Sequence, residues 1–389
     1  MKNSRRRFLE STALTSGAIL GGNQTAYGAT SNKPNVDLIR VGVMAVGDYS
    51  HLNSKGAIWA PVINPTEPDR WPCRTTRMLI THCWDSRADR AREFAQRYKC
   101  TAVDHYDDMV GEIDALITGG MYECRWWPKL TRPYLEAGIP TFINRPFALS
   151  MHDAKDMVET AIKHKTPIMS TDAHEDLESG LVARGIVHKL RREKKTIFGA
   201  SATTNAHEYP AHMVHGLYLV LSVFGLNVEK VSLQAPGWWQ EKTQTNSRRM
   251  DWGMLTLQYS GIEVDNAEPQ NKPFLVTVHA IDGSHGSRST LRIYYQGGFD
   301  NFDHHIIPGD LINNRYHLQS KTVFDIQRMF ESGEMPQSYD DILRKTHIFL
   351  TGFKSHIDHG GMMVPVDSVT DDWEAPSPYP DWINESIFG

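Results

Sequence analysis

The sequence contains little cysteine, no excess of positive charge and no long hydrophobic run. Only 4 cysteines occur in 389 residues, and none of them forms a C-x-x-C pair, so a disulfide framework is excluded. Lys and Arg number 41 against 46 Asp and Glu, a net charge of −5, so a nucleic-acid partner is not expected. No apolar run reaches transmembrane length, so stable membrane insertion is not expected either.

The N-terminus carries an export pattern instead. Ser4 to Leu9, with the sequence SRRRFL, is typical of a twin-arginine signal, and a mildly apolar stretch from Ser11 to Gly22 follows it. Ala26-Tyr27-Gly28 puts small residues at the two positions that a signal peptidase recognises. We therefore predict a signal peptide at residues 1–29 and a periplasmic or otherwise exported protein. The alternative is a basic, disordered N-terminus.

Strand and helix patterns alternate at short spacing from residue 37 to residue 170. Such alternation predicts βαβ units and a doubly wound parallel sheet, which we assign to a Rossmann-like dinucleotide-binding domain at residues 36–165. The predicted strands are 37–44, 78–84, 114–118, 140–144 and 167–170, and the predicted helices are 86–98, 126–137 and 151–163. An irregular insertion is expected between residues 53 and 77.

The second half changes character. Strand-like segments separated by turn signals predict an α+β domain with a large, mostly antiparallel sheet at residues 166–370, followed by a Pro- and Trp-rich tail at 371–389. The predicted strands are 196–205, 228–234, 254–259, 274–281 and 290–295, and the predicted helices are 178–189, 211–224 and 339–358. The predicted fold class is α/β.

Three landmarks, in this order, resemble the Gfo/Idh/MocA family of sugar-active, dinucleotide-binding oxidoreductases. They are the strand at Val41 to Met44 with the turn after it, the strand end Asn144-Arg145-Pro146, and the histidine-containing helix from Ala211 to Gly225. The resemblance extends over residues 36–370. It implies a sugar or oligosaccharide substrate, bound NAD and a homo-oligomer that pairs through the C-terminal sheet.

The family's dinucleotide loop, G-x-G-x-x-G, corresponds here to residues 45–50, and only its middle glycine, Gly47, is kept. That glycine allows close backbone approach to a pyrophosphate. Ala45 can fit the tight turn if its φ is negative, and Ser50 can pack at the helix start or donate its hydroxyl to phosphate. The alternative is a Rossmann-like core that has lost its cofactor.

Asp85 ends the second predicted strand. A carboxylate there binds a ribose 2′-hydroxyl and favours NAD over NADP, but it is equally suited to cap the following helix. The expected cofactor contacts are Gly47, Ser50, Asp85, Gly119 and Asn144. Because an exported enzyme meets no diffusible nicotinamide pool, NAD would have to stay bound and be recycled within one catalytic cycle.

Asn144-Arg145-Pro146 stands where the family has Glu-Lys-Pro, whose lysine contacts substrate and nicotinamide and helps to move a proton. Arg145 can hold a hydroxyl-rich or anionic substrate through its planar guanidinium, but it cannot act as a base. By the same resemblance, we expect the Arg145–Pro146 bond to be cis or sharply turned.

His215 matches the family's general base. The family's aspartate four residues earlier is replaced here by Ala211, so a carboxylate partner is expected to be missing. His212 lies on the same helix face, and His174 follows the strand that enters the second domain. The expected catalytic residues are His215, Arg145, His174, His212 and Tyr218.

The histidines leave three interpretations open. His215 is a general base; or His207, His212 and His215 bind a divalent metal together with Glu208 or Asp172; or all are ordinary polar residues. Three functions correspond to these interpretations. The first is an NAD-dependent sugar oxidoreductase, whose cycle includes redox-assisted glycoside cleavage as one outcome. The others are an NAD-independent metal- or His-dependent lyase or hydrolase, and a non-catalytic sugar-binding protein.

Overall fold

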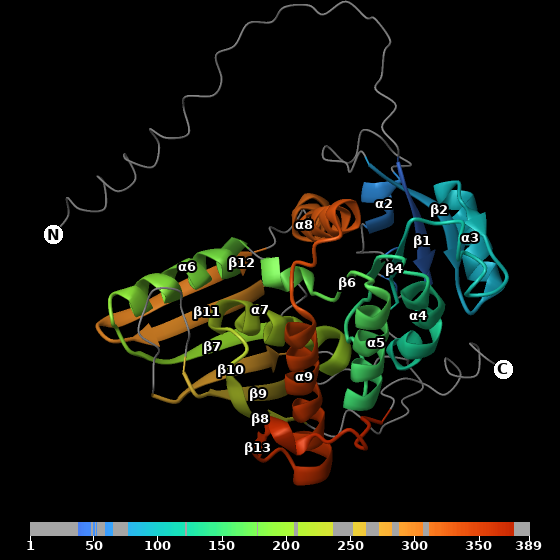
Figure 1. Cartoon of the computed structure of the whole chain (residues 1–389). Coiled ribbons are helices and arrows are strands. Elements are labelled where there is room, and N and C mark those ends of the chain that lie inside the picture. Colours follow the sequence, from blue (N-terminus) through green and yellow to red (C-terminus); the bar gives the residue numbers. More distant parts are fainter. Residues whose placement is uncertain are drawn as a thin grey trace, which may run out of the picture. The chain divides into compact units, whose positions relative to one another are not determined.

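Figure 1 shows the computed structural model of the chain. It describes residues 38–47, 50, 52, 59–64, 77–120, 123–176, 178–205, 209–235, 252–261, 272–281, 288–305 and 311–376. The predicted signal peptide lies outside the described residues, as does most of the predicted tail. Within the described part of the chain, no helix has the length and hydropathy needed to cross a membrane.

The first sheet is parallel throughout, with six strands in the order β3-β2-β1-β4-β5-β6. This is the strand order of the Rossmann fold, so the predicted doubly wound sheet is confirmed. The strands are β1 (Ile39–Met44), β2 (Met78–Trp84), β3 (Thr101–Ala102), β4 (Ala115–Thr118), β5 (Thr141–Phe142) and β6 (Ile168–Met169). All four residues of β4 are buried, which explains why its sequence is an apolar run, closed by Thr118, rather than an alternating pattern.

Three predicted helices accompany this sheet, α3 (Ala88–Tyr98), α4 (Trp127–Glu136) and α5 (Met151–His164). A short helix, α2 (Trp59–Ile63), occupies part of the segment for which we expected only irregular structure. Its five residues are too few to show a helical period in the sequence. Four of them are buried, so this part of the insertion belongs to the core.

The second sheet has seven strands in the order β12-β11-β7-β10-β9-β8-β13. Its pairs are antiparallel except for β7 with β10, which are parallel, so the predicted mostly antiparallel sheet is confirmed. The strands are β7 (Ile197–Asn205), β8 (Val228–Gln234), β9 (Trp252–Tyr259), β10 (Phe274–Ile281), β11 (Arg288–Tyr295), β12 (Gly298–His305) and β13 (Val364–Pro365). The predicted domain boundaries remain a prediction.

The helices associated with this sheet are α6 (Glu178–Arg192), α7 (Val214–Phe224), α8 (Leu311–Ser332) and α9 (Tyr339–His359). A π-helical turn, Tyr209–Met213, leads into α7. The sequence analysis did not predict α8. Its buried residues Val323, Ile326 and Met329 lie in the same apolar cluster as Trp59 of α2, and Figure 1 shows these two helices near each other.

Close packing between α9 and the π-helical turn fixes the position of α7. Tyr209 is fully buried and its hydroxyl donates a 2.9 Å hydrogen bond to the carbonyl of Phe349. The Tyr209 and Phe349 rings stack with centroids 5.1 Å apart. Gly352 lies directly beneath the Tyr209 hydroxyl, because a Cβ at residue 352 would come within 2.3 Å of that oxygen.

We predict that Gly352→Ala lowers the free energy of unfolding by about 1–3 kcal/mol, because the Tyr209 ring is packed on all sides and has no space into which to move. Urea denaturation measures the change. Gly185→Ala in α6 is the matched control. Nothing lies within 4 Å of a Cβ at that position, so this substitution should instead raise stability by about 0.5–1 kcal/mol. A Gly352→Ala variant as stable as Gly185→Ala would contradict the packing argument.

Candidate active site

The strand order of the first sheet reverses between β1 and β4, which pair side by side. Ligands of doubly wound sheets bind at the carboxyl ends of the strands at such a point. Ala45, the first residue after β1, has a φ of 55°, so it occupies the turn without meeting the condition of a negative φ that we set for it. The tight turn out of β1 requires the left-handed region, and an alanine adopts it at a cost of about 1 kcal/mol.

Four of the predicted cofactor residues meet at this edge. The Ser50 amide donates to the Gly47 carbonyl at 3.0 Å, and the Ser50 hydroxyl lies so close to Gly119 that a Cβ on Gly119 would come within 2.3 Å of it. The Asn144 side-chain amide donates to the carbonyls of Gly119 and Gly120, each at 3.0 Å. The loops after β1, β4 and β5 are therefore tied together.

Asp85 follows β2 at the same edge and is only 4% exposed. Its Oδ1 accepts a 3.0 Å hydrogen bond from the Arg87 amide, whereas its Oδ2 has no hydrogen-bond partner within the described part of the chain. The N-cap of α3 is Arg87, not Asp85. Burial raises the pKa of the Asp85 carboxyl, opposed by the Arg87 amide and by the charge of Arg90.

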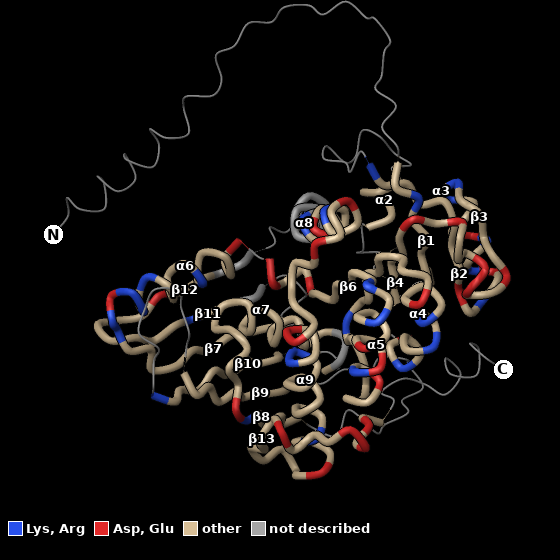
Figure 2. The backbone as a smooth tube through the Cα atoms, in the orientation of Figure 1, with Lys and Arg blue, Asp and Glu red and all other residues tan. Residues whose placement is uncertain are grey.

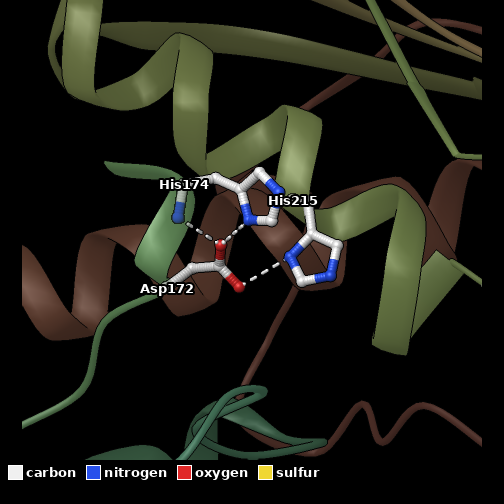
Figure 3. A group of neighbouring side chains, drawn as sticks. All are labelled: Asp172, His174 and His215. Atoms are coloured by element: carbon white, nitrogen blue, oxygen red, sulfur yellow. Dashed lines mark hydrogen bonds and ion pairs between the residues drawn. The ribbon is translucent and has the colours of Figure 1, made fainter. Parts of the chain in front are cut away.

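A second group of side chains surrounds Asp172, as Figure 3 shows. Asp172 Oδ1 accepts hydrogen bonds from His174 Nδ1 at 2.7 Å and from the His174 amide at 2.8 Å. Asp172 Oδ2 accepts from His215 Nδ1 at 2.8 Å and from Arg145 Nε. The side chains of Asp172 and Arg145 are each 2% exposed, so this is a buried ion pair shared with two imidazoles.

Different elements supply these side chains. Arg145 follows β5 and its peptide bond to Pro146 is cis, as expected. Asp172 follows β6, His174 lies in the 3₁₀ turn Ala173–Asp176, and His215 is in the first turn of α7. Glu175 braces the turn, because it accepts a 2.9 Å hydrogen bond from Thr171 and pairs with Lys345 of α9.

His215 therefore has a carboxylate partner, which corrects our expectation that it would have none. We had looked for the carboxylate at position 211, one helical turn earlier, where the family pattern places it. The structure supplies it from Asp172, 43 residues away in the chain. Asp172 was expected only as an alternative metal ligand, and Glu175 and Lys345 were not among the expected catalytic residues. The available signal was the position of Asp172 directly after a predicted strand.

The protonation states follow from burial and charge. Burial alone would raise the pKa of Asp172, but His215, Arg145 and His174 hold it well below its usual range. Burial lowers the pKa of His215 well below its usual value; Asp172 opposes this shift, while His174 and Arg145 add to it. His215 is thus neutral at pH 7. Because a carboxylate only accepts, its Nδ1 carries the proton and its Nε2 keeps a lone pair.

In this structure Arg145 Nη2 donates a 3.2 Å hydrogen bond to that lone pair on His215 Nε2. The centroids of the His174 and His215 rings are 4.0 Å apart, and the ring planes are tilted by 30°. The His212 ring is farther away, at 6.0 Å from that of His215 and nearly perpendicular to it. Tyr218, one turn later in α7, is 3% exposed with the Lys345 ammonium 5.7 Å from its ring centre.

The predicted metal ligand His207 lies outside the described residues. Within the described residues, the one group with metal-ligand composition is Asp172, His174 and His215, whose candidate atoms all lie within 4.8 Å of one another. A divalent cation there would have to displace the Arg145 guanidinium from both Asp172 and His215. The positive charge of Arg145 therefore favours a proton-transfer site over a metal site.

The comparisons with known proteins agree with this geometry. A family model described as "Oxidoreductase family, NAD-binding Rossmann fold" matches residues 63–172, the segment that contains Asp85, Asn144, Arg145 and Asp172. The predicted resemblance to the Gfo/Idh/MocA oxidoreductases is confirmed. The comparison with curated proteins gave no match.

Solved structures of inositol dehydrogenases share the fold. Scyllo-inositol dehydrogenase from Lactobacillus casei, with bound NAD(H) and scyllo-inositol, has a TM-score of 0.63 at 11% identity over 85% of this chain and 100% of that one. Myo-inositol 2-dehydrogenase from Lactobacillus plantarum has a TM-score of 0.63 at 13% identity, over 85% and 99% of the two chains. At these identities the likeness establishes the Gfo/Idh/MocA-like fold alone.

We predict that the free energy of unfolding falls as the pH drops from 7 to 5, and falls less in His215→Gln. The pKa of His215 is lowered from 6.5 in the folded state, so the unfolded chain binds a proton first and gains stability relative to the fold. Urea denaturation at both pH values measures the difference. His347 and His356 have lowered pKa values for the same reason, burial, so part of the slope remains.

The control for this experiment is His105→Gln, because His105 is exposed and should leave the slope unchanged. Equal slopes for the wild-type protein and His215→Gln would show that His215 is not held neutral by the fold.

Proposed function

We propose that this protein is an exported, carbohydrate-active oxidoreductase that oxidises a sugar hydroxyl with a tightly bound NAD and reuses that NAD within one catalytic cycle. The observation that carries the proposal is the His215 imidazole. It is neutral, it is oriented by Asp172 through Nδ1, and it has a lone pair at Nε2, at the carboxyl end of a Rossmann sheet. A positioned base of this kind suits removal of a hydroxyl proton.

The described residues fit a dinucleotide. The turn out of β1 is left-handed at Ala45, the conformation that the first glycine of the motif favours, and Gly47 follows two residues later. The Asp85 Oδ2 is buried without a partner within the described residues, and a ribose hydroxyl would satisfy it. Ser50, Gly119 and Asn144 would complete the cofactor edge. Bound NAD would supply the hydride acceptor.

Proton transfer is then the task of this chain's own residues. The substrate hydroxyl takes the place of Arg145 Nη2 at His215 Nε2 and gives its proton to the imidazole. The Asp172 carboxylate stabilises the imidazolium, as the aspartate of a catalytic triad does. Arg145 keeps its charge throughout, so it binds and stabilises negative charge that develops on the sugar oxygen but carries no proton itself.

His174 extends the proposal to glycoside cleavage. It shares the Asp172 carboxylate with His215 and lies beside it, so one imidazole can accept a proton while the other donates one to a departing sugar oxygen. The same pair is the observation that supports the second candidate function, a His-dependent lyase or hydrolase that works without NAD. The cofactor content of the purified protein separates the two.

We further propose that two copies pair through the second sheet. Its outer face exposes large apolar side chains from neighbouring strands, Trp252, Leu275, Ile281, Tyr294 and Phe299. The β-ladder places Trp252 opposite Ile281 towards one end of this face. Tyr294 lies opposite Phe299 and in one row with Leu275 through Gly199 towards the other end, so apolar side chains occupy both ends of the face. A second copy of the chain carries the same apolar side chains on the same face, so the two faces can pack against each other. By contrast, Figure 2 shows charges of both signs interspersed along the helices.

We predict that protein purified without added cofactor releases close to one NAD per chain when it is denatured. The His215→Asn variant should retain this NAD but lose at least ~100-fold in turnover on any sugar that the wild-type protein oxidises, because a positioned base contributes ~10²–10⁴-fold. An enzymatic cycling assay on the denatured supernatant measures the NAD.

His105→Asn serves as the exposed control and should change neither quantity. Absence of NAD together with cleavage of a glycan would move the assignment to the NAD-independent lyase or hydrolase. Bound glycan with no turnover in the wild-type protein would leave only the non-catalytic sugar-binding function.

Export rests on the sequence SRRRFL at residues 4–9. We predict that the full chain is recovered from the periplasm of a bacterium that has the twin-arginine pathway, and that Arg5→Lys/Arg6→Lys keeps it in the cytoplasm. Arg7→Lys, which alters the variable position of the motif, is the control and should be exported normally. Export of the double variant would contradict the assignment. Cell fractionation with an antibody to the chain gives the readout.

A further inference from the structure

A cavity of about 450 Å³ lies between the helices α6, α7, α8 and α9 and the end of β6 (Figure 1). Its volume falls within the range of roughly 300–1,000 Å³ that is typical of small-molecule sites. Arg145, Asp172, His174 and His215 are not among the residues that line it, so it is separate from the candidate active site. Its wall carries four acidic and four basic side chains.

The acidic side chains of this wall already have partners. Lys345 pairs with Glu175, and Lys321 bridges Asp176 and Asp325 at 2.9 and 2.5 Å. The fourth acidic residue belongs to the capping box at the start of α9. These carboxylates therefore repel an anion in the cavity less than free carboxylates would.

The basic side chain that stands apart is Arg184 of α6. It is half-buried, it lines the cavity, and it makes no hydrogen bond or ion pair with any other residue that the structure describes. A guanidinium binds a carboxylate through two parallel N–H···O hydrogen bonds. Because Arg184 is a single unpaired cation, a group with one negative charge fits it better than a doubly charged phosphate, which the neighbouring carboxylates would repel.

Other parts of the wall suit hydroxyl groups. The Ser222 hydroxyl of α7 donates a 2.8 Å hydrogen bond to the Leu219 carbonyl, so its oxygen can still accept one. The Asp176 and Asp325 carboxylates have more lone pairs than Lys321 uses, and these can accept protons from hydroxyl groups. A ligand that fits all of these groups carries one carboxylate and several hydroxyls.

We propose that this cavity is a second ligand site, which binds a small hydroxylated carboxylate of the sugar-acid class with its carboxylate on Arg184. The cavity adjoins the turn that supports the candidate active site, because the Glu175 amide donates to the Asp172 carbonyl at 2.9 Å. A ligand in the cavity nevertheless does not contact His215. Binding requires neither NAD nor the proposed reaction, so a variant of His215 separates the two sites.

The test is isothermal titration of the full-length protein with D-gluconate at pH 7. The wild-type protein should show saturable binding at one site, and D-glucose, which lacks the carboxylate, should bind at least ~10-fold more weakly. Arg184→Met should weaken gluconate binding at least ~10-fold for the same reason. Leu181→Glu alters an exposed residue of the cavity wall and should also weaken it, because a glutamate three residues before Arg184 in a helix pairs with that guanidinium.

Lys189→Met is the matched control. Lys189 lies on the same helix, and its side chain is 63% exposed, so this variant should bind gluconate as the wild-type protein does. His215→Asn should also bind it normally. The proposal is overturned if the wild-type protein shows no saturable gluconate binding, or if Arg184→Met binds as tightly as Lys189→Met. Loss of binding in His215→Asn but not in Arg184→Met would also overturn it, because gluconate would then occupy the candidate active site.

Discussion

The arrangement of the site depends on one buried carboxylate. Removing Asp172 and Arg145 from water costs several kcal/mol for each charge. The ion pair and the hydrogen bonds that both carboxylate oxygens of Asp172 accept offset this cost. The guanidinium, two imidazoles and one backbone amide bind the carboxylate. Three separate stretches of chain, after β5, after β6 and at the start of α7, must therefore meet for the fold to be stable, and the catalytic geometry follows from the same requirement.

Arginine in place of lysine changes what this site can do. A lysine at residue 145 would share the work of moving a proton, because a buried ammonium can lose its charge, whereas a guanidinium does not. The permanent charge of Arg145 has two opposite effects on the pair beside it. It helps to keep Asp172 ionised and helps to keep His215 neutral. Under the proposed function, the imidazoles would therefore carry the whole proton-transfer task.

The sequence was sufficient for every strand of the first sheet except the two-residue β3 and for most of the second sheet, because the predicted strands are mainly apolar runs with clear ends. It was not sufficient for α8 or for β12, a strand with only two apolar residues in the sequence GFDNFDHH. The candidate site likewise has residues that the sequence could predict and residues that it could not. His215 and Arg145 stand at family positions, whereas Asp172 reaches His215 from another element, and no spacing along one helix can reveal a partner supplied by the tertiary fold.

The turn out of β1 keeps a positive φ although no glycine stands there. Glycine is favoured after β1 because the turn needs a positive φ, yet Ala45 adopts φ 55° with a Cβ that is buried. The cost of that conformation is about 1 kcal/mol, which the hydrogen bonds from Ala45 to Trp84 and from Gly119 to Met44 are sufficient to offset. A missing glycine is therefore weak evidence for a lost cofactor. The proposal of a hydroxyl-bearing ligand at this edge draws instead on the buried Asp85 carboxylate, whose Oδ2 has no well-aligned donor within the described residues.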